Sequence, residues 1–318
     1  MLLSRVADAL YWISRYLERA EQTARVIDVV VDLGLGRATT VRDGALERLY
    51  GSLGLGPPAP GDHLGLLADA AFFDPANRNS VMACITAARE NARQVREEIS
   101  CDMWEQLNEF YLRLRQIQED AGWASRTHYL ARSVIEGSHL FQGITDATMA
   151  HGEGWQYLQV GRCLERAGST SALLDLFLSD ATEPSQPTAL DQAEWVVLLR
   201  SCSALEAYCR HYTAVVRPER VAEFLLLNAE FPRSVRFAAA GLEAALLAIA
   251  RASGRRAGGR VERLAGRLHA SLDYAQVDEI LSDDPHGYLA GINRQCALVH
   301  TVLMQTYTTY PIETALPA

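Results

Sequence analysis

Nearly the same charged helical motif occurs twice in this chain, about half a chain length apart. Residues 15–20 read Arg-Tyr-Leu-Glu-Arg-Ala, and residues 162–167 read Arg-Cys-Leu-Glu-Arg-Ala. The offset is 147 residues (165 minus 18) in a chain of 318. A repeat this long indicates duplication of a whole group of helices, because the units of a solenoid span only about 20–50 residues. We therefore expect two related halves, approximately residues 1–150 and 151–310, in a pseudo-twofold arrangement.

Helical periodicity runs through most of the chain, and no segment is convincing as a β-strand. In residues 2–33, apolar side chains recur at spacings of three and four, as they do on one face of a helix. Asn79 or Ser80 is expected to cap a later helix, and residues 179–188 read as a linker between helices. Further helices are expected over residues 46–50, 64–73, 80–99, 104–119, 125–143, 155–178, 190–216, 219–227, 234–251, 259–272 and 287–306. The sequence predicts an all-α helical bundle that forms a single domain over residues 1–318.

Composition and charge argue against several classes of function. The net charge of −9 argues against a general nucleic-acid binder, which usually carries a basic face. The chain contains no Lys, which excludes a Schiff-base lysine and leaves Arg as the only permanent cation. No signal peptide and no membrane-spanning segment are expected, because charged residues interrupt the apolar runs. The six cysteines form no C-x-x-C pair, so we expect reduced, mostly buried thiols in a cytoplasmic protein.

The two copies of the motif are the leading candidates for a binding site. In each copy, two arginines and one glutamate share one band of the helix. These residues are Arg15, Glu18, Arg19, Arg162, Glu165 and Arg166. Because an unpaired buried ion is costly, we expect Glu18 and Glu165 to be held by arginines of the other copy. Two interpretations stay open: an ion-pair lattice that fixes the register of the two halves, or a pocket whose arginines bind a carboxylate or phosphate.

A second group of candidate ligand-binding residues lies in residues 87–108. Arg89 and Arg93 share one helix face, and Trp104 and Asn108 lie one turn apart on the next expected helix. Such a row of charges on its own is typical of a solvated helix face. The sequence does not show whether this group approaches the repeated motif.

Metal binding has weaker support than anion binding. Glu136 and His139 have the E-x-x-H spacing of di-iron helical bundles. Those sites need two such motifs and two further glutamates, and no second E-x-x-H occurs in this chain. We therefore expect neither a metal nor a cofactor and keep these two residues only as weak candidates. No G-x-S-x-G motif for nucleophilic catalysis is present either.

Several segments of the chain resemble the bacterial alpha-E domain family, an all-helical domain with Glu-Arg motifs. The resemblance is carried by residues 1–21 (MLLSRVADALYWISRYLERAE), 88–93 (ARENAR), 103–108 (MWEQLN), 148–149 (TM) with 161–167 (GRCLERA), and 231–235 (FPRSV). It implies an all-α fold in a cytoplasmic bacterial protein. It also implies association with circularly permuted ATP-grasp proteins and transglutaminase-like proteases, in systems proposed to make and cleave peptide or amide linkages. The alpha-E domain itself has no established activity.

The leading hypothesis is a non-catalytic helical accessory protein of an ATP-grasp peptide or amide ligase system. Its partners would be the circularly permuted ATP-grasp protein, a transglutaminase-like protease and a peptide-like or carboxylate ligand, with no nucleic acid and no membrane. The anchors for the ligand would be Arg15, Arg19, Arg162 and Arg166. We expect no ATP-grasp or protease segment in this chain, because the helical repeat accounts for its length.

Two alternative functions remain open from the sequence. The first is an enzyme of the same pathway that uses Glu18 or Glu165 as general base beside arginine electrophiles, with His128 or His139 as a further participant. The second is a metal-binding helical bundle.

Overall fold

Fourteen α-helices build the described part of the chain, and no strand occurs there. The computed structural model describes residues 2–34, 43–55, 63–120, 122–178, 189–254 and 258–308; the linker expected at 179–188 lies outside them. The α-helices are α1 (Ser4–Gly34), α2 (Asp43–Ser52), α3 (His63–Phe72), α4 (Val81–Gln94), α5 (Cys101–Glu119), α6 (Thr127–Thr148), α7 (Glu153–Leu178), α8 (Ala189–Ser201), α9 (Leu205–His211), α10 (Pro218–Leu227), α11 (Val235–Ala252), α12 (Arg260–Asp273), α13 (Val277–Ser282) and α14 (Pro285–Leu303). A short 3-10 helix, η1 (Trp123–Arg126), and a π-helical turn, η2 (Met304–Thr308), complete the set. The prediction of an all-α fold is confirmed.

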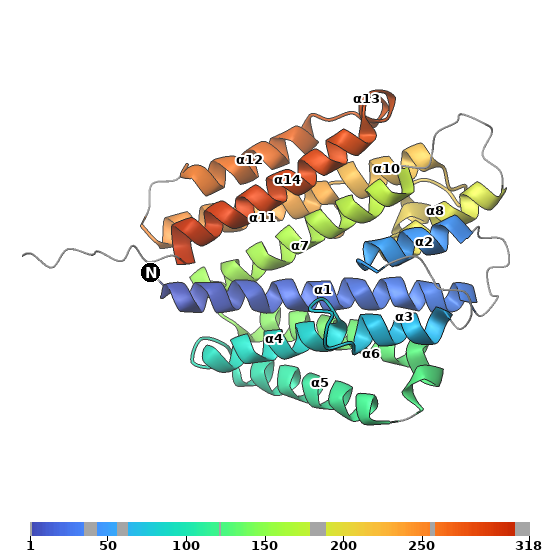
Figure 1. Ribbon diagram of the computed structural model, residues 1–318. Coiled ribbons are helices and arrows are strands. Elements are labelled where there is room, and N and C mark those ends of the chain that lie inside the picture. The colour runs from blue at the N-terminus through green and yellow to red at the C-terminus, as the bar shows by residue number, and fades with distance from the viewer. Residues whose placement is uncertain are drawn as a thin grey trace, which may run out of the picture.

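The long helices α1 and α7 run side by side through the centre of the molecule (Figure 1). On one side of the pair, α4 and α6 pack against α1, and α5 packs on these two helices. On the other side, α11 and α14 pack against α7, and α12 packs on them. One copy of the repeated motif lies on α1 and the other on α7. The fold therefore brings the two motifs together, while the pseudo-twofold relation of the halves stays a prediction.

The backbones of α1 and α7 approach closely at Gly161. A Cβ added at this position would clash with the carbonyl oxygen of Tyr11 and the hydroxyl of Ser14. Ser14 is also the position that the offset of 147 residues pairs with Gly161. The close approach therefore joins equivalent points of the two copies, just before the charged residues of each motif.

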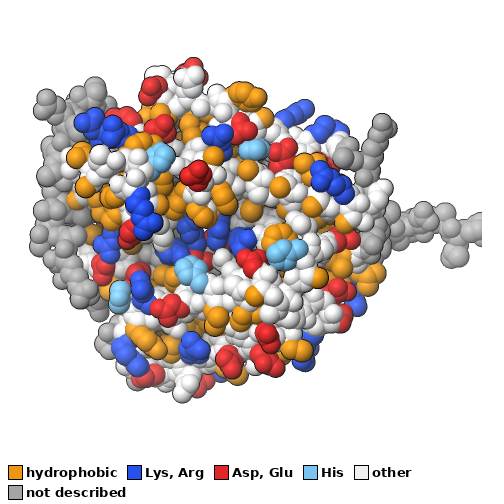
Figure 2. All heavy atoms as spheres, turned by 180° about the vertical axis from the view of Figure 1, so that it is seen from behind, with side chains coloured by type: hydrophobic (Ala, Val, Ile, Leu, Met, Phe, Trp, Pro, Cys, Tyr) orange, Lys and Arg blue, Asp and Glu red, His pale blue; other side chains and the backbone are white. Residues whose placement is uncertain are grey.

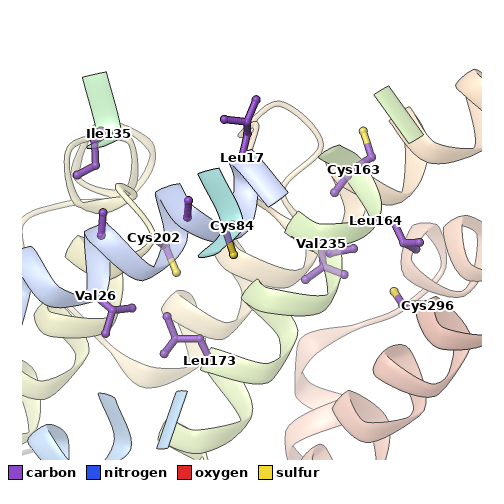
Figure 3. Close-up of a cluster of buried hydrophobic side chains, with 14 of the residues drawn as sticks. Leu17, Val26, Cys84, Ile135, Cys163, Leu164, Leu173, Cys202, Val235 and Cys296 are labelled. Atoms are coloured by element: carbon purple, nitrogen blue, oxygen red, sulfur yellow. The ribbon is translucent and has the colours of Figure 1, made fainter. Parts of the chain in front are cut away.

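The core between the helices is apolar and contains most of the cysteines. Figure 3 shows Cys84, Cys163, Cys202 and Cys296 among leucine, isoleucine and valine side chains. These four cysteines are buried and free, as expected for reduced thiols. Burial raises the pKa of Cys84, Cys202 and Cys296 to about 12, so their thiols keep their protons at neutral pH. In the described part of the chain, no helix combines the length and the apolar character needed to cross a membrane.

The structure departs from the expected helices most clearly at three places. The helix expected over 190–216 is two helices, α8 and α9, because Ser203 between them adopts a φ of +49°, which an α-helix does not accommodate. The helix expected over 80–99 ends at Gln94, and Ser100 caps a new helix, α5. Helix α13 was not expected, because a helix of six residues is too short to show a periodic pattern.

Ser80, one of the two expected caps, begins helix α4. Its side chain accepts a hydrogen bond of 3.3 Å from the backbone nitrogen of Ala83, and it is buried away from water. We expect Ser80→Ala to lower the free energy of unfolding by about 1 kcal/mol, because the amide loses its acceptor. Urea unfolding of both proteins measures the difference, and an unchanged midpoint would contradict a capping role for this hydroxyl.

Candidate functional site

Glu165 on α7 is held by two arginines of α1. Arg19 donates from Nε to Oε1 at 2.8 Å and from Nη2 to Oε2 at 3.2 Å, and Arg15 donates from Nε to Oε2. Burial favours a raised pKa for Glu165, but the neighbouring Arg15 and Arg19 outweigh it and lower the pKa below its usual range. Glu165 is therefore an ionised carboxylate at neutral pH.

Arg15 is fixed from its other side by Tyr11. The guanidinium donates to the Tyr11 hydroxyl, which lies 2.8 Å from Nδ1 of His300. Burial raises the pKa of Tyr11 to about 12, so the phenol keeps its proton at neutral pH. The guanidinium of Arg15 thus has a defined place between Tyr11 and Glu165.

Glu18 on α1 is held in turn by Arg166 of α7. Arg166 donates from Nε to Oε1 at 2.7 Å, and Nη1 of Arg233 lies 3.2 Å from the same oxygen. Arg166 and Arg19 are equivalent under the offset of 147 residues. The expectation that each glutamate is held by arginine of the other copy is therefore confirmed for both copies, and the two motifs are in contact.

Glu21 forms a third centre that the sequence reasoning missed. This carboxylate is fully buried and accepts from Arg25 at 2.6 Å, from Arg233, and from Nε2 of His139 at 3.1 Å. Burial favours a raised pKa for Glu21, but Arg233, His139 and Arg25 lower it far below its usual range. One signal was available: Glu21 and Arg25, four residues apart, interrupt the apolar residues of a buried helix.

The charged groups around these carboxylates, some buried and some partly buried, include more cations than anions. We define the Glu-Arg network as three carboxylates and six arginines: Glu18, Glu21, Glu165, Arg15, Arg19, Arg25, Arg162, Arg166 and Arg233. Six cations against three anions leave an excess of three positive charges when all groups are ionised. Burial and the Arg233 cation together lower the pKa of Arg25, as expected where cations are in excess. Figure 2 shows arginine side chains gathered in the hollowed middle of one face, with histidines beside them.

A cavity of about 270 Å³ lies between α7 and α11, next to this network. Arg162 and Arg166 line it from α7, while Phe237 and Ala245 belong to a mostly apolar wall from α11. We call it the α7–α11 pocket. Arg162 donates to Gln159, and among the described residues it has no carboxylate partner. Its remaining guanidinium donors are therefore available to an anion in the pocket.

A second cavity, of about 350 Å³, lies beside Arg19 on α1. Asn79 and Ser169 line it together with Glu165. Each nitrogen of Arg19 already has a partner, because Nε and Nη2 bond Glu165 and Nη1 bonds Asn79 at 2.9 Å. This cavity is consequently a weaker anion site than the α7–α11 pocket.

The second group of expected ligand-binding residues forms a separate cluster on α4 and α5. Arg89 donates to Asn108 at 2.8 Å and lies over the ring of Trp104, with 5.6 Å from its guanidinium carbon to the ring centroid. Arg93 is 60% exposed and pairs with Glu90 at 2.9 Å. The structure thus joins Arg89, Trp104 and Asn108, while Arg93 is linked to Arg89 only through their shared partner Glu90. No described contact joins this cluster to the Glu-Arg network.

The two alternative functions gain little from the geometry. A glutamate whose pKa is lowered, as that of Glu165 is, makes a weak general base. His128 lies 2.6 Å from Asp28, and His139 contacts Glu21; in the described contacts neither histidine reaches Glu18 or Glu165.

The metal candidates do not form a ligand set in the described residues. No group of three or more His, Cys, Asp or Glu lies there in an arrangement that could hold a metal ion. Glu136 is exposed, and Nε2 of His139 donates to Glu21 and lies 2.9 Å from Nη2 of Arg25, a cation that opposes a metal ion at the same place. The E-x-x-H spacing therefore has another explanation, a bond between α6 and α1.

Comparisons with known proteins identify the family. A family model named Alpha-E, described as a predicted alpha-helical domain with a conserved ER motif, matches residues 2–308. The chain belongs to this family. Uncharacterized proteins of Mycobacterium bovis and Mycobacterium tuberculosis are 25% identical to it over 320 residues, which cover 94% of this chain and 35% of theirs. The chain thus spans about a third of the length of these relatives. No solved structure matches it.

Proposed function

We propose that this chain is a non-catalytic binding protein that holds a carboxylate-bearing ligand in the α7–α11 pocket and works with an ATP-grasp peptide or amide ligase. The observation that carries the proposal is the excess of buried and partly buried arginine beside a pocket, in a chain whose net charge is −9. Buried cations without counter-charges are costly, and a bound anion offsets that cost. The proposed association with a ligase comes from the family resemblance. The mycobacterial relatives are almost three times as long as the matched region, which supports a domain that acts together with a further segment.

The chemistry of the pocket suits a small carboxylate with an apolar tail. The planar guanidinium of Arg162 can donate two parallel hydrogen bonds to a carboxylate. Phe237 and Ala245 offer an apolar surface opposite it. The volume of 270 Å³ lies near the lower end of ligand pockets, which span about 300–1,000 Å³. A small molecule or the end of a peptide therefore fits better than an extended ligand.

The carboxylate site is tested by Arg162→Gln with 4-methylpentanoate as the probe. We expect the unmodified protein to bind this probe and the variant to bind it at least about tenfold more weakly, because a hydrogen bond to a charged group contributes about 1.5–3 kcal/mol. Isothermal titration calorimetry measures both affinities. Arg113→Gln is the matched control, since it removes the same charge from an exposed position on α5 and should leave binding unchanged. No binding to the unmodified protein, or equal losses in both variants, would refute the site.

The ligase association needs a separate experiment. Affinity capture of the protein at its native expression level, followed by mass spectrometry and an ATP-turnover assay, identifies what accompanies it. We expect an ATP-grasp protein in stoichiometric amount. A protein that elutes alone would contradict the accessory role while leaving the carboxylate site to its own test.

A further inference from the structure

Glu18 has a buried carboxylate oxygen that no described donor reaches. The residue is only 1% exposed. Its Oε1 accepts from Arg166 at 2.7 Å and lies 3.2 Å from Arg233, but its Oε2 has no hydrogen-bond partner. A buried, unpartnered oxygen of a carboxylate is costly, so this atom is where a donor from a ligand would gain most.

The other copy of the motif shows what kind of group belongs there. The offset of 147 residues pairs Glu18 with Glu165 and Arg162 with Arg15. Arg15 donates to Oε2 of Glu165, whereas Arg162 turns to Gln159. Arg15 therefore provides a donor to Oε2 of Glu165, whereas its equivalent in the repeat, Arg162, provides none to Oε2 of Glu18. The two halves differ at this point: Oε2 of Glu18 has no hydrogen-bond partner, and Arg162 has no carboxylate partner among the described residues.

Glu18 belongs to the lining of a small cavity. The cavity has a volume of about 20 Å³. Leu17, Phe141 and Leu158 form an apolar part of its lining, and Ser14, Gln142, Thr145, Gln159 and Arg162 complete it with Glu18. That volume holds about one group of the size of water, which an ammonium head matches and a guanidinium exceeds. Gln159 and Arg162 also line the α7–α11 pocket, so these two side chains are common to both cavities.

We propose that the ligand is a free amino acid with an apolar side chain. Its ammonium group donates to Oε2 of Glu18, its carboxylate accepts from Arg162, and its side chain packs against Phe237 on α11. The inference rests on the carboxylate site proposed above and adds the ammonium contact to it. A zwitterion satisfies both unused groups at once, while a simple carboxylate leaves Oε2 of Glu18 without a partner.

Three probes on the unmodified protein separate this inference from the carboxylate site alone. L-leucine carries both charged groups, 4-methylpentanoate lacks the amine, and 3-methylbutylamine lacks the carboxylate. We expect calorimetry to show leucine binding at least about tenfold more tightly than either analogue, as a charged hydrogen bond implies. Equal affinities of leucine and 4-methylpentanoate would overturn the inference and leave the carboxylate site standing. If none of the three binds, both proposals fail.

A variant of Glu18 locates the ammonium contact. Glu18→Gln should reduce the affinity for leucine to that for 4-methylpentanoate, because the amide replaces an anionic acceptor of the same shape. Glu119→Gln, which removes a charge from an exposed position on α5, should change neither affinity. Undiminished binding of leucine to Glu18→Gln would overturn the assignment. Should Glu18→Gln fail to fold, the three probes on the unmodified protein decide the question.

Discussion

Replacing Glu21 with glutamine is expected to lower the free energy of unfolding by about 3–5 kcal/mol, the cost of removing one partner from a buried ion pair. Glu21 is completely buried and bonds Arg25, Arg233 and His139, which belong to three different segments of the fold. Glutamine keeps the shape of the side chain but not its charge. The two buried guanidinium groups then repel each other with one carboxylate fewer to offset them. Urea unfolding measures the loss.

An exposed ion pair provides the control for this prediction. Glu119 and Arg115 on α5 lie 3.1 Å apart with side chains 68% and 51% exposed. Glu119→Gln makes the same chemical change and should alter the free energy of unfolding by less than about 1 kcal/mol. If the two variants were equally stable, Glu21 would contribute no more to stability than an exposed carboxylate of a surface ion pair.

The same carboxylate makes stability depend on pH in the acidic range. Burial opposes ionisation of Glu21, but Arg233, His139 and Arg25 lower its folded-state pKa below the value of about 4.3 typical of an unfolded chain. A lowered pKa stabilises the fold above the unfolded-state value, and that stabilisation disappears as the pH falls through the folded-state pKa. The urea concentration at the unfolding midpoint should therefore decrease as the pH is lowered beneath about 4.3. This decrease should be less steep in Glu21→Gln. Equal slopes would assign the acid sensitivity to other carboxylates.

A long helix such as α1 can be predicted from the sequence because the spacing of its apolar residues repeats over many turns. Helix α1 shows the apolar spacing of three and four that a helix face produces, whereas α7 is buried on nearly every side because it lies between α1, α11 and α14. The break at Ser203 could not be predicted in this way, since a positive φ at a residue other than glycine carries no sequence signal. Helix α13 is held by its contacts with α10 and α14, which are properties of the folded chain.

From the sequence, only the part of the candidate site that lies within the two copies of the repeated motif could be predicted. The two Glu-Arg copies implied that Glu18 and Glu165 would be held across the central helix pair, and they are. Arg233 lies 212 positions from Glu21 and joins the network only through tertiary packing. The rotation of Arg162 toward Gln159 breaks the relation between the copies, so repeat symmetry would have placed it wrongly.

Gly161→Ala is expected to lower the free energy of unfolding by about 3 kcal/mol, at the upper end of what an added methyl group costs in a close-packed core. The new Cβ would meet the carbonyl oxygen of Tyr11, a backbone atom of α1 that cannot rotate aside. Helices α1 and α7 must therefore move apart. That movement also lengthens the Arg19–Glu165 and Arg166–Glu18 contacts, which lie within two turns of the crossing. Urea unfolding measures the change in stability.

Gly143→Ala is the matched control, because it adds the same methyl group to a helix at an unobstructed place. Gly143 lies on the exposed side of α6, and a Cβ there would have no neighbour within 4 Å. Alanine loses less backbone entropy than glycine on folding, so this variant should gain about 0.5–1 kcal/mol. The two substitutions should thus have opposite signs. A neutral Gly161→Ala would mean that α1 and α7 can separate without cost, and the Glu-Arg pairs would then not depend on this close approach.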